Sequence, residues 1–156
     1  MSKLFQKVTL CVLAGSLSVA AIAADPVITR EQAVERVKKA AEFYKANGKD
    51  KSIAEFNNKD SPFNQGGIYM FGQLFDAEIT QPIHANPKIR GKQMAGLKDA
   101  NGVFIIKELN AICEKKGSGW LEYNWPNPAT GAIDKKSSYV EKMGDMCIGT
   151  GIFTPK

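Results

Sequence analysis

The chain has 156 residues, a formal net charge of +5 and 44% hydrophobic residues, which suits one domain with a sizeable core. The three arginines, Arg30, Arg36 and Arg90, form no basic stripe of the kind that binds nucleic acid. The chain has one histidine and no CxxCH motif, which excludes a c-type haem and leaves no metal-ligand cluster. We therefore expect no cofactor and no metal.

Residues 1–23 have the three parts of a secretory signal peptide. Lys3 and Lys7 precede an apolar core from Val8 to Val19, and an Ala-x-Ala cleavage site ends at Ala23. The alternative is an uncleaved membrane anchor, for which the apolar core is short and interrupted by glycine and serine. Cleavage predicts a periplasmic or secreted domain over residues 24–156 that does not span the membrane. Losing the two lysines lowers its formal charge to +3.

The mature chain begins with a helix. Thr29 and Gln32 have the spacing of a capping box, and the apolar residues that follow recur at helical spacing for about five turns. Gly48 ends this helix as a C-cap. A second, short helical turn is predicted over Ser52–Asn57, before a loop rich in asparagine, aspartate and serine.

Two strands and a third helix are predicted next. Gly67–Phe75 is rich in β-forming residues, and Ile79–His84 returns as a second strand in which Pro82 favours an edge position. Asn86–Lys98 is a connector. Apolar positions at helical spacing predict a helix over Val103–Lys116.

The C-terminal part reads as a three-strand meander. Two turns separate the runs Ser118–Trp125, Ile133–Lys142 and Met146–Phe153. The whole chain therefore predicts an α+β fold, with a five-stranded antiparallel sheet, a long N-terminal helix and a crossing helix between strands two and three.

The mature chain keeps two cysteines, Cys113 and Cys147, because Cys11 lies in the signal peptide. In an oxidising compartment one disulfide is the simple interpretation, and two separate buried thiols are the alternative. Cys113 falls on the predicted helix and Cys147 on the last strand. A disulfide would therefore join the helix to the sheet.

The order of these elements and several short motifs resemble the PAS-like Cache fold, and in particular the single-Cache type 2 domains of bacterial extracytoplasmic sensors. The likeness runs from about Arg30 to Phe153. The motifs that carry it are Asn57-Asn58, Tyr69-Met70-Phe71, Asn86-Pro87, Leu97-Lys98-Asp99, Gly119-Trp120, Tyr123-Asn124-Trp125-Pro126-Asn127-Pro128, Lys136-Ser137-Ser138-Tyr139 and Ile148-Gly149-Thr150-Gly151.

This resemblance implies a pocket for a small ligand, commonly a short organic acid, on one face of the sheet. It implies these ligand-binding residues: Tyr69, Phe71, Tyr123, Trp125, Lys136 and Tyr139. His84 is a further candidate. The family often has a His-Pro pair near this point, whereas here the order is Pro82-Ile83-His84, which could turn the histidine to the other face.

Each of these residues also has a plainer interpretation. Strand alternation puts Tyr123 and Trp125 on one face, where they could simply pack in the core. Lys136 could be a solvated surface cation, and a lone histidine such as His84 is often structural. The Asn127–Gly131 segment reads as a turn alone. As a pocket residue, Lys136 would offer a positive charge to a carboxylate, and the tyrosines would offer hydroxyl groups.

Three functions follow as hypotheses. The first is a periplasmic module that binds a small molecule, a carboxylate by chemical class, and acts through a separate membrane receptor or transporter component, because no output domain follows in the sequence. The second is an envelope structural or adaptor protein without a small-molecule ligand. The third, an enzyme, is disfavoured because the sequence offers no nucleophile–base pair and no metal cluster. We expect the chain not to be an enzyme.

Overall fold

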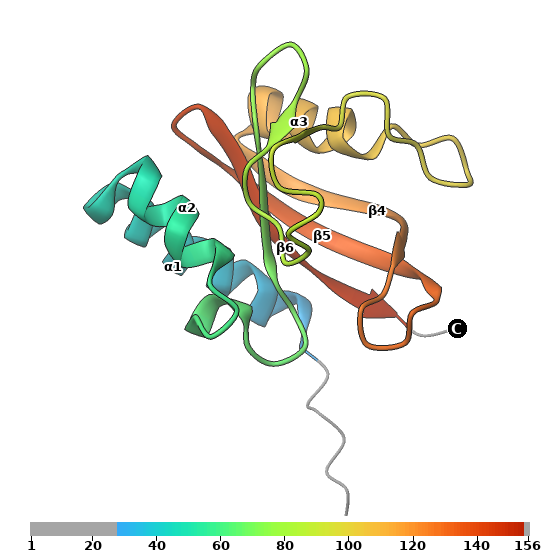
Figure 1. Ribbon diagram of the computed structural model, residues 1–156, viewed down its shortest axis with the longest axis horizontal. Helices are drawn as coiled ribbons and strands as arrows, with labels where there is room; N and C mark the ends of the chain where they lie inside the picture. Colours follow the sequence, from blue (N-terminus) through green and yellow to red (C-terminus); the bar gives the residue numbers. More distant parts are fainter. Residues whose placement is uncertain (1–27, 155–156) are drawn as a thin grey trace, which may run out of the picture.

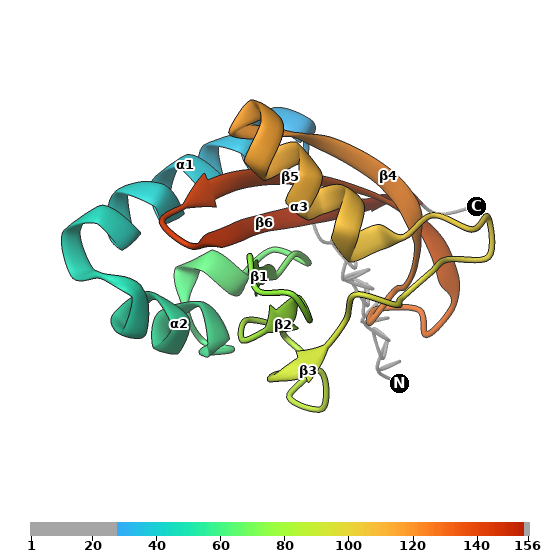
Figure 2. The ribbon, with the colours of Figure 1, turned by 90° about the horizontal axis from the view of Figure 1, so that it is seen from above.

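The structure, a computed structural model, describes residues 28–154, so the predicted signal peptide lies outside the described residues. A four-stranded antiparallel sheet, in the order β1-β6-β5-β4, forms its centre, and α1 and α3 cover opposite faces of this sheet (Figures 1 and 2). This arrangement confirms the predicted α+β class. The strands of the sheet are β1 (Met70–Leu74), β4 (Ser118–Pro126), β5 (Ile133–Met143) and β6 (Met146–Thr154).

The N-terminal helix α1 (Arg30–Asn47) forms as predicted. The Thr29 side chain accepts a hydrogen bond from the Gln32 amide, and the Gln32 side chain accepts one from the Thr29 amide, so both bonds of the capping box are present. Gly48, with a φ of +79°, ends α1 and precedes α2 (Lys49–Asn57), which is longer than the predicted turn. A single 3₁₀ turn, η1 (Pro62–Asn64), follows.

The predicted meander is also confirmed. Strands β4, β5 and β6 pair consecutively, and the Gly144-Asp145 turn joins the last two. Gly144 has a φ of +60°, and a Cβ on it would lie 2.5 Å from the Tyr44 hydroxyl. The turn therefore requires glycine for both its conformation and its contact with α1.

The five-strand count is wrong. The predicted second strand shortens to β2 (Thr80–Gln81), which pairs with β3 (Lys92–Gln93) in a separate two-stranded sheet. Ile79 has a φ of +52°, and Pro82 has no amide hydrogen to donate, so the chain does not continue the ladder with β1. It touches β1 again at one bridge, between Ile83 and Gly72.

The two faces of the sheet bury different clusters. On one face, Val37 and Ala40 of α1 pack on Met146 and Ile148. On the other face, α3 (Ile105–Lys116) packs over Val140 and a row of aromatic side chains.

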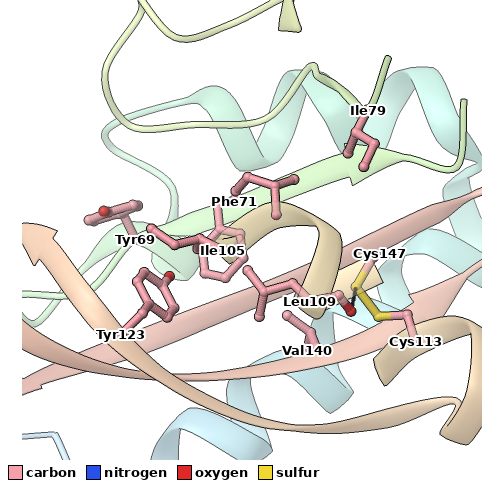
Figure 3. Packing of buried hydrophobic residues seen from close by; sticks show 10 residues of the cluster. Tyr69, Phe71, Ile79, Ile105, Leu109, Cys113, Tyr123, Val140 and Cys147 are labelled. Carbon is pink, nitrogen blue, oxygen red and sulfur yellow. Dashed lines mark hydrogen bonds between the residues drawn. A yellow bond between two sulfur atoms is a disulfide. The ribbon is translucent and has the colours of Figure 1, made fainter. Parts of the chain in front are cut away.

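A disulfide lies at one end of this second cluster, and two tyrosines lie at the other end (Figure 3). Cys113 of α3 and Cys147 of β6 form a disulfide, with their Cα atoms 5.8 Å apart, as expected for a helix–sheet link. Tyr69 and Tyr123 lie at the opposite end of the row. The disulfide anchors α3 at one end of this face and leaves the tyrosine end for a site.

Candidate functional site

The central side chain of this face is Lys136 on β5. Its residue is only 1% exposed, although lysine is seldom fully buried. The strand register puts Lys136 between Tyr123 of β4 and Phe153 of β6. Its ammonium group crosses β6 to reach Tyr69, the residue directly before β1, where Nζ lies 2.9 Å from the tyrosine hydroxyl and donates a hydrogen bond to it.

Glycine in β6 makes this path possible. A Cβ on Gly151 would lie 2.6 Å from Cε of Lys136, a distance that no ordinary contact allows. The lysine stem therefore lies directly over the backbone of Gly151. Aromatic rings surround the end of the stem, with Nζ at 4.1 Å from the ring centre of Tyr69, 4.9 Å from that of Phe71 and 5.2 Å from that of Phe153.

No counter-ion neutralises this lysine in the described part of the chain. Within residues 28–154, no carboxylate oxygen lies within 4.0 Å of the Lys136 Nζ. Burial disfavours the charged form and lowers the pKa of Lys136 to about 7. The ammonium group is thus ready to accept an anion, which would supply the missing partner.

Two tyrosines line the same site as neutral hydroxyl groups. Tyr123 is 5% exposed, and its hydroxyl lies 2.9 Å from the Ser138 hydroxyl, with which it shares a hydrogen bond. Burial raises the pKa of both Tyr69 and Tyr123, so both stay protonated at neutral pH. The Tyr69 oxygen accepts from Lys136, which leaves its own hydrogen free to be donated.

His84 lies on this face, contrary to the alternative that its shifted position raised. Its ring packs at a tilt against two aromatic rings, with ring centres 5.1 Å from Tyr69 and 6.0 Å from Trp125. Burial first, and then the charges of Lys136 and Arg90, lower the pKa of His84 to about 4. The imidazole is therefore neutral at pH 7.

The local hydrogen bonds also determine which nitrogen of His84 carries the proton. Nδ1 accepts from the Asn86 amide at 2.9 Å, so the neutral ring carries its hydrogen on Nε2. The main chain of His84 is held at both ends: its amide donates to the Asn57 side chain at 3.1 Å, and Arg90 donates to its carbonyl at 2.7 Å. The ring is thus a positioned donor.

A cavity of about 270 Å³ opens beside these groups. Tyr69, His84 and Trp125 form part of its wall. Lys136 does not line the cavity itself but donates a hydrogen bond to the hydroxyl of Tyr69, which does. Its other lining residues are Ala85, Asn86, Ile89, Pro126, Asn127, Pro128 and Gly131. The space suits a molecule of a few heavy atoms, since sites for drug-sized ligands measure about 300–1,000 Å³.

Larger hollows occur elsewhere but lack such a site. One of about 440 Å³ lies along α1, where Arg30 sits 4.1 Å above the ring of Trp120 among exposed charged side chains. Another of about 440 Å³ lies between α1 and the Gly144 turn. Neither has a lining residue that is hydrogen-bonded to a buried lysine, as Tyr69 is, and we place the candidate site at the smaller cavity.

The Asn127–Gly131 turn also lines this cavity, although the sequence predicts only a connection there. The Asn127 side chain donates to the Asp134 carboxylate at 2.9 Å, and the Thr130 hydroxyl donates to the same oxygen at 3.2 Å. Asn127 and Asp134 are 6% and 5% exposed. The sequence signal for this role is the asparagine before proline in the Trp-Pro-Asn-Pro run, a pattern that by itself predicts only a turn.

Tyr139 is the one predicted site residue that lies elsewhere. Its side chain is on the opposite face of the sheet, where its ring centre is 5.4 Å from that of Trp120 and it packs with the α1 cluster. Successive strand residues face opposite ways, so a residue three positions from Lys136 cannot share its face. The structure brings together the other six: Tyr69, Phe71, His84, Tyr123, Trp125 and Lys136.

A sequence model of the Cache domain family matches residues 29–154. The chain belongs to the Cache domain family. This Cache domain is 30% identical to a methyl-accepting chemotaxis protein of Vibrio parahaemolyticus of known structure, with a TM-score of 0.61, over 77% of this chain and 82% of that one. The structure of a Cache chemosensory domain solved for carboxylic acid recognition shares the fold, with 22% identity and a TM-score of 0.60 over 80% and 88% of the two chains.

A curated relative is the methyl-accepting chemotaxis protein McpP of Pseudomonas putida. It is 28% identical over 71 residues, which make up 44% of this chain and 13% of that receptor. The Cache domain thus aligns with a small part of its relative. Within residues 28–154, no helix combines the length and the apolar character needed to cross a membrane, and no cluster of three or more potential metal ligands occurs.

Proposed function

We propose that this Cache domain is an extracytoplasmic module that binds a small monocarboxylate. The observation that carries the proposal is the buried ammonium of Lys136, which has no counter-ion within residues 28–154 and donates to Tyr69, a residue that lines a cavity of about 270 Å³. A buried carboxylate and a buried ammonium are each costly alone and compensate one another when paired. The Tyr69 hydroxyl and the Nε2–H of His84 add directional donors for the carboxylate oxygens.

The ligand class follows from the charges around the cavity. Lys136 offers one positive charge, and the carboxylate of Asp134 on the same face of β5 is already engaged by Asn127 and Thr130. No free carboxylate of the described site remains for an α-ammonium group. The site therefore favours a monocarboxylate with a short apolar tail over an amino acid, because Trp125, Pro126 and Ile89 line the remaining wall.

The relatives support binding rather than catalysis. The chemotaxis proteins that resemble this chain are receptors, and one Cache structure was solved for carboxylic acid recognition. We propose by analogy that the domain reports its ligand to a separate membrane receptor or transporter component, in the periplasm or outside the cell. The domain assignment, residues 1–23 as signal peptide and 24–156 as the Cache domain, belongs to the same proposal.

A thermal-shift screen with matched variants tests this function. A ligand at about one hundred times its dissociation constant stabilises a protein by about 2.7 kcal/mol, which is a shift of several degrees. Small monocarboxylates should raise the melting temperature of the wild type and of Lys135→Met, whose lysine is exposed, but not of Lys136→Met. A flat screen on folded protein would favour an envelope adaptor instead. A response retained by Lys136→Met would refute this site.

A further inference from the structure

The ammonium group of Lys136 faces only neutral groups from the elements around it. Just before β1 it meets Tyr69, and in the segment after β2 it is near His84, whose pKa of about 4 leaves the ring uncharged. The floor beneath its stem, in β6, is Gly151 and Phe153, and α3 contributes apolar residues such as Ile105 and Leu109 to this face. Tyr123 of β4 pairs with Lys136 in the sheet, Asp134 lies on the same face of β5, and Arg90 follows β2. Each of the three has polar partners of its own.

This arrangement holds a lysine that is easily neutralised when the site contains no anion. The only hydrogen-bond acceptor that the described structure gives Nζ is the Tyr69 hydroxyl, and burial brings the Lys136 pKa to about 7. An anion in the cavity would favour the charged form, as any opposite charge nearby does. Binding of the anion and protonation of the lysine are then linked, because each stabilises the other.

We propose that Lys136 takes up a proton when the cavity binds a carboxylate, so that the domain responds to the anion and the proton together. This inference rests on the proposed function and specifies its regulation. Overall the site takes up one carboxylate and one proton, which is the composition of the undissociated acid. The domain would therefore respond more strongly to the same concentration of anion in a mildly acidic medium than in an alkaline one.

The dependence on pH has a defined form. Above the pKa of the ligand-free lysine, the apparent dissociation constant should rise about tenfold per pH unit, because one proton must be bound with each anion. Below that pKa it should stay flat until the carboxyl group of the ligand itself is protonated, near pH ~4–5. His84, Tyr69 and Tyr123 do not titrate in the interval between these limits, since His84 is already neutral there and both tyrosines stay protonated.

Calorimetric titration of the purified protein with propionate, in two buffers of different ionisation enthalpy, measures this proton uptake directly. We expect about half a proton per propionate near pH 7 and about one near pH 8.5, with the tenfold weakening per pH unit. Lys136→Arg carries a permanent charge, so its affinity should be independent of pH and its proton uptake zero. Lys135→Arg, at the exposed neighbouring position, should behave as the wild type.

The outcomes separate this inference from the proposed function. If propionate binds at pH 8.5 with no proton uptake, the coupling is wrong and carboxylate binding stands. If neither propionate nor the other acids of the screen bind at pH 6, where Lys136 is charged, the proposed function itself fails. Titration of the Lys136 Cε signal by NMR in ligand-free protein gives a second readout: a midpoint near pH 7 supports the coupling, and one above pH ~10 overturns it even if Lys136→Arg does not fold.

Discussion

Lys136 and Tyr69 are joined twice over, since Nζ lies 2.9 Å from the tyrosine hydroxyl and 4.1 Å from the centre of the same ring. The residues are 67 positions apart in sequence: Lys136 lies on β5, and Tyr69 directly precedes β1, with β6 between the two strands. The hydrogen bond therefore links the buried lysine to Tyr69, a residue that lines the cavity. Four predictions follow from it and from its surroundings.

Tyr69→Phe should keep the ring but remove the acceptor of Lys136. We expect the free energy of unfolding to fall by about 1–2 kcal/mol at pH 6, where the lysine is charged, and by less at pH 9, where it is neutral. Denaturant unfolding at the two pH values measures the difference. Tyr139→Phe, on the opposite face of the sheet, is the matched control and should show no such dependence on pH. An equal loss for Tyr69→Phe at both pH values would contradict the role of the hydroxyl as partner of the charge.

Lys136 should make the stability of the ligand-free domain rise with pH. Its pKa is about 7 in the folded protein and near 10.4 when unfolded, so between these values the unfolded state binds more protons than the folded state. Stability should therefore increase from about pH 7 toward pH 10, by at most about 1.4 kcal/mol per pH unit. Denaturant unfolding of the wild type and Lys136→Met tests this. The variant should lose the slope, and a slope unchanged in the variant would assign it to another group.

Gly151→Ala should displace the lysine stem without adding a polar group. The new Cβ would clash with Oγ of Ser138 and would lie 2.6 Å from Cε of Lys136, so we expect a loss of about 1–3 kcal/mol in the free energy of unfolding and a weaker thermal response to carboxylates. Gly96→Ala is the control, because a Cβ there meets nothing within 4 Å. If Gly151→Ala left both the stability and the ligand response unchanged, the lysine would not depend on this path.

Removal of the disulfide should destabilise the domain while sparing the site. The Cys113–Cys147 link spans 34 positions, for which chain-entropy models give about 3–4 kcal/mol. The double variant Cys113→Ser, Cys147→Ser should unfold at lower denaturant and, while still folded, bind the same carboxylates, because the cystine lies at the far end of the row from Tyr69 (Figure 3). A thiol assay of the denatured wild type should find these two cysteines oxidised. Free thiols there would contradict the bond.

Local sequence patterns were sufficient for most of the elements. The Thr29–Gln32 capping box predicted the start of α1, and the two turns predicted the meander, because caps and turns involve residues that are close in the chain. The prediction of the second strand was wrong because strand pairing, unlike a cap or a turn, involves residues that are far apart in the chain. Pairing of β2 with β3 depends on where the chain goes after Pro82, which no local pattern specifies.

The residues of the site also divide into those that a local pattern predicts and those that only the folded chain brings together. Strand alternation was enough to put Tyr123 and Trp125 on one face, and it also contained the reason to exclude Tyr139, which is an odd number of positions from Lys136. By contrast, the roles of Asn127 and Asp134 are visible only in the folded hairpin. There Asn127 lines the cavity, and its side chain is held by a hydrogen bond to Asp134.

The sequence by itself therefore determined the Cache fold, the cysteine pair and the presence of a lysine among aromatic residues on one strand face, since these depend on composition, spacing and local conformation. Only the tertiary structure decided that this lysine is buried without a counter-ion and rests over Gly151 against Tyr69. Burial and the lack of a counter-ion depend on groups from several elements that meet at one point. That meeting is a property of packing, which no local sequence pattern specifies.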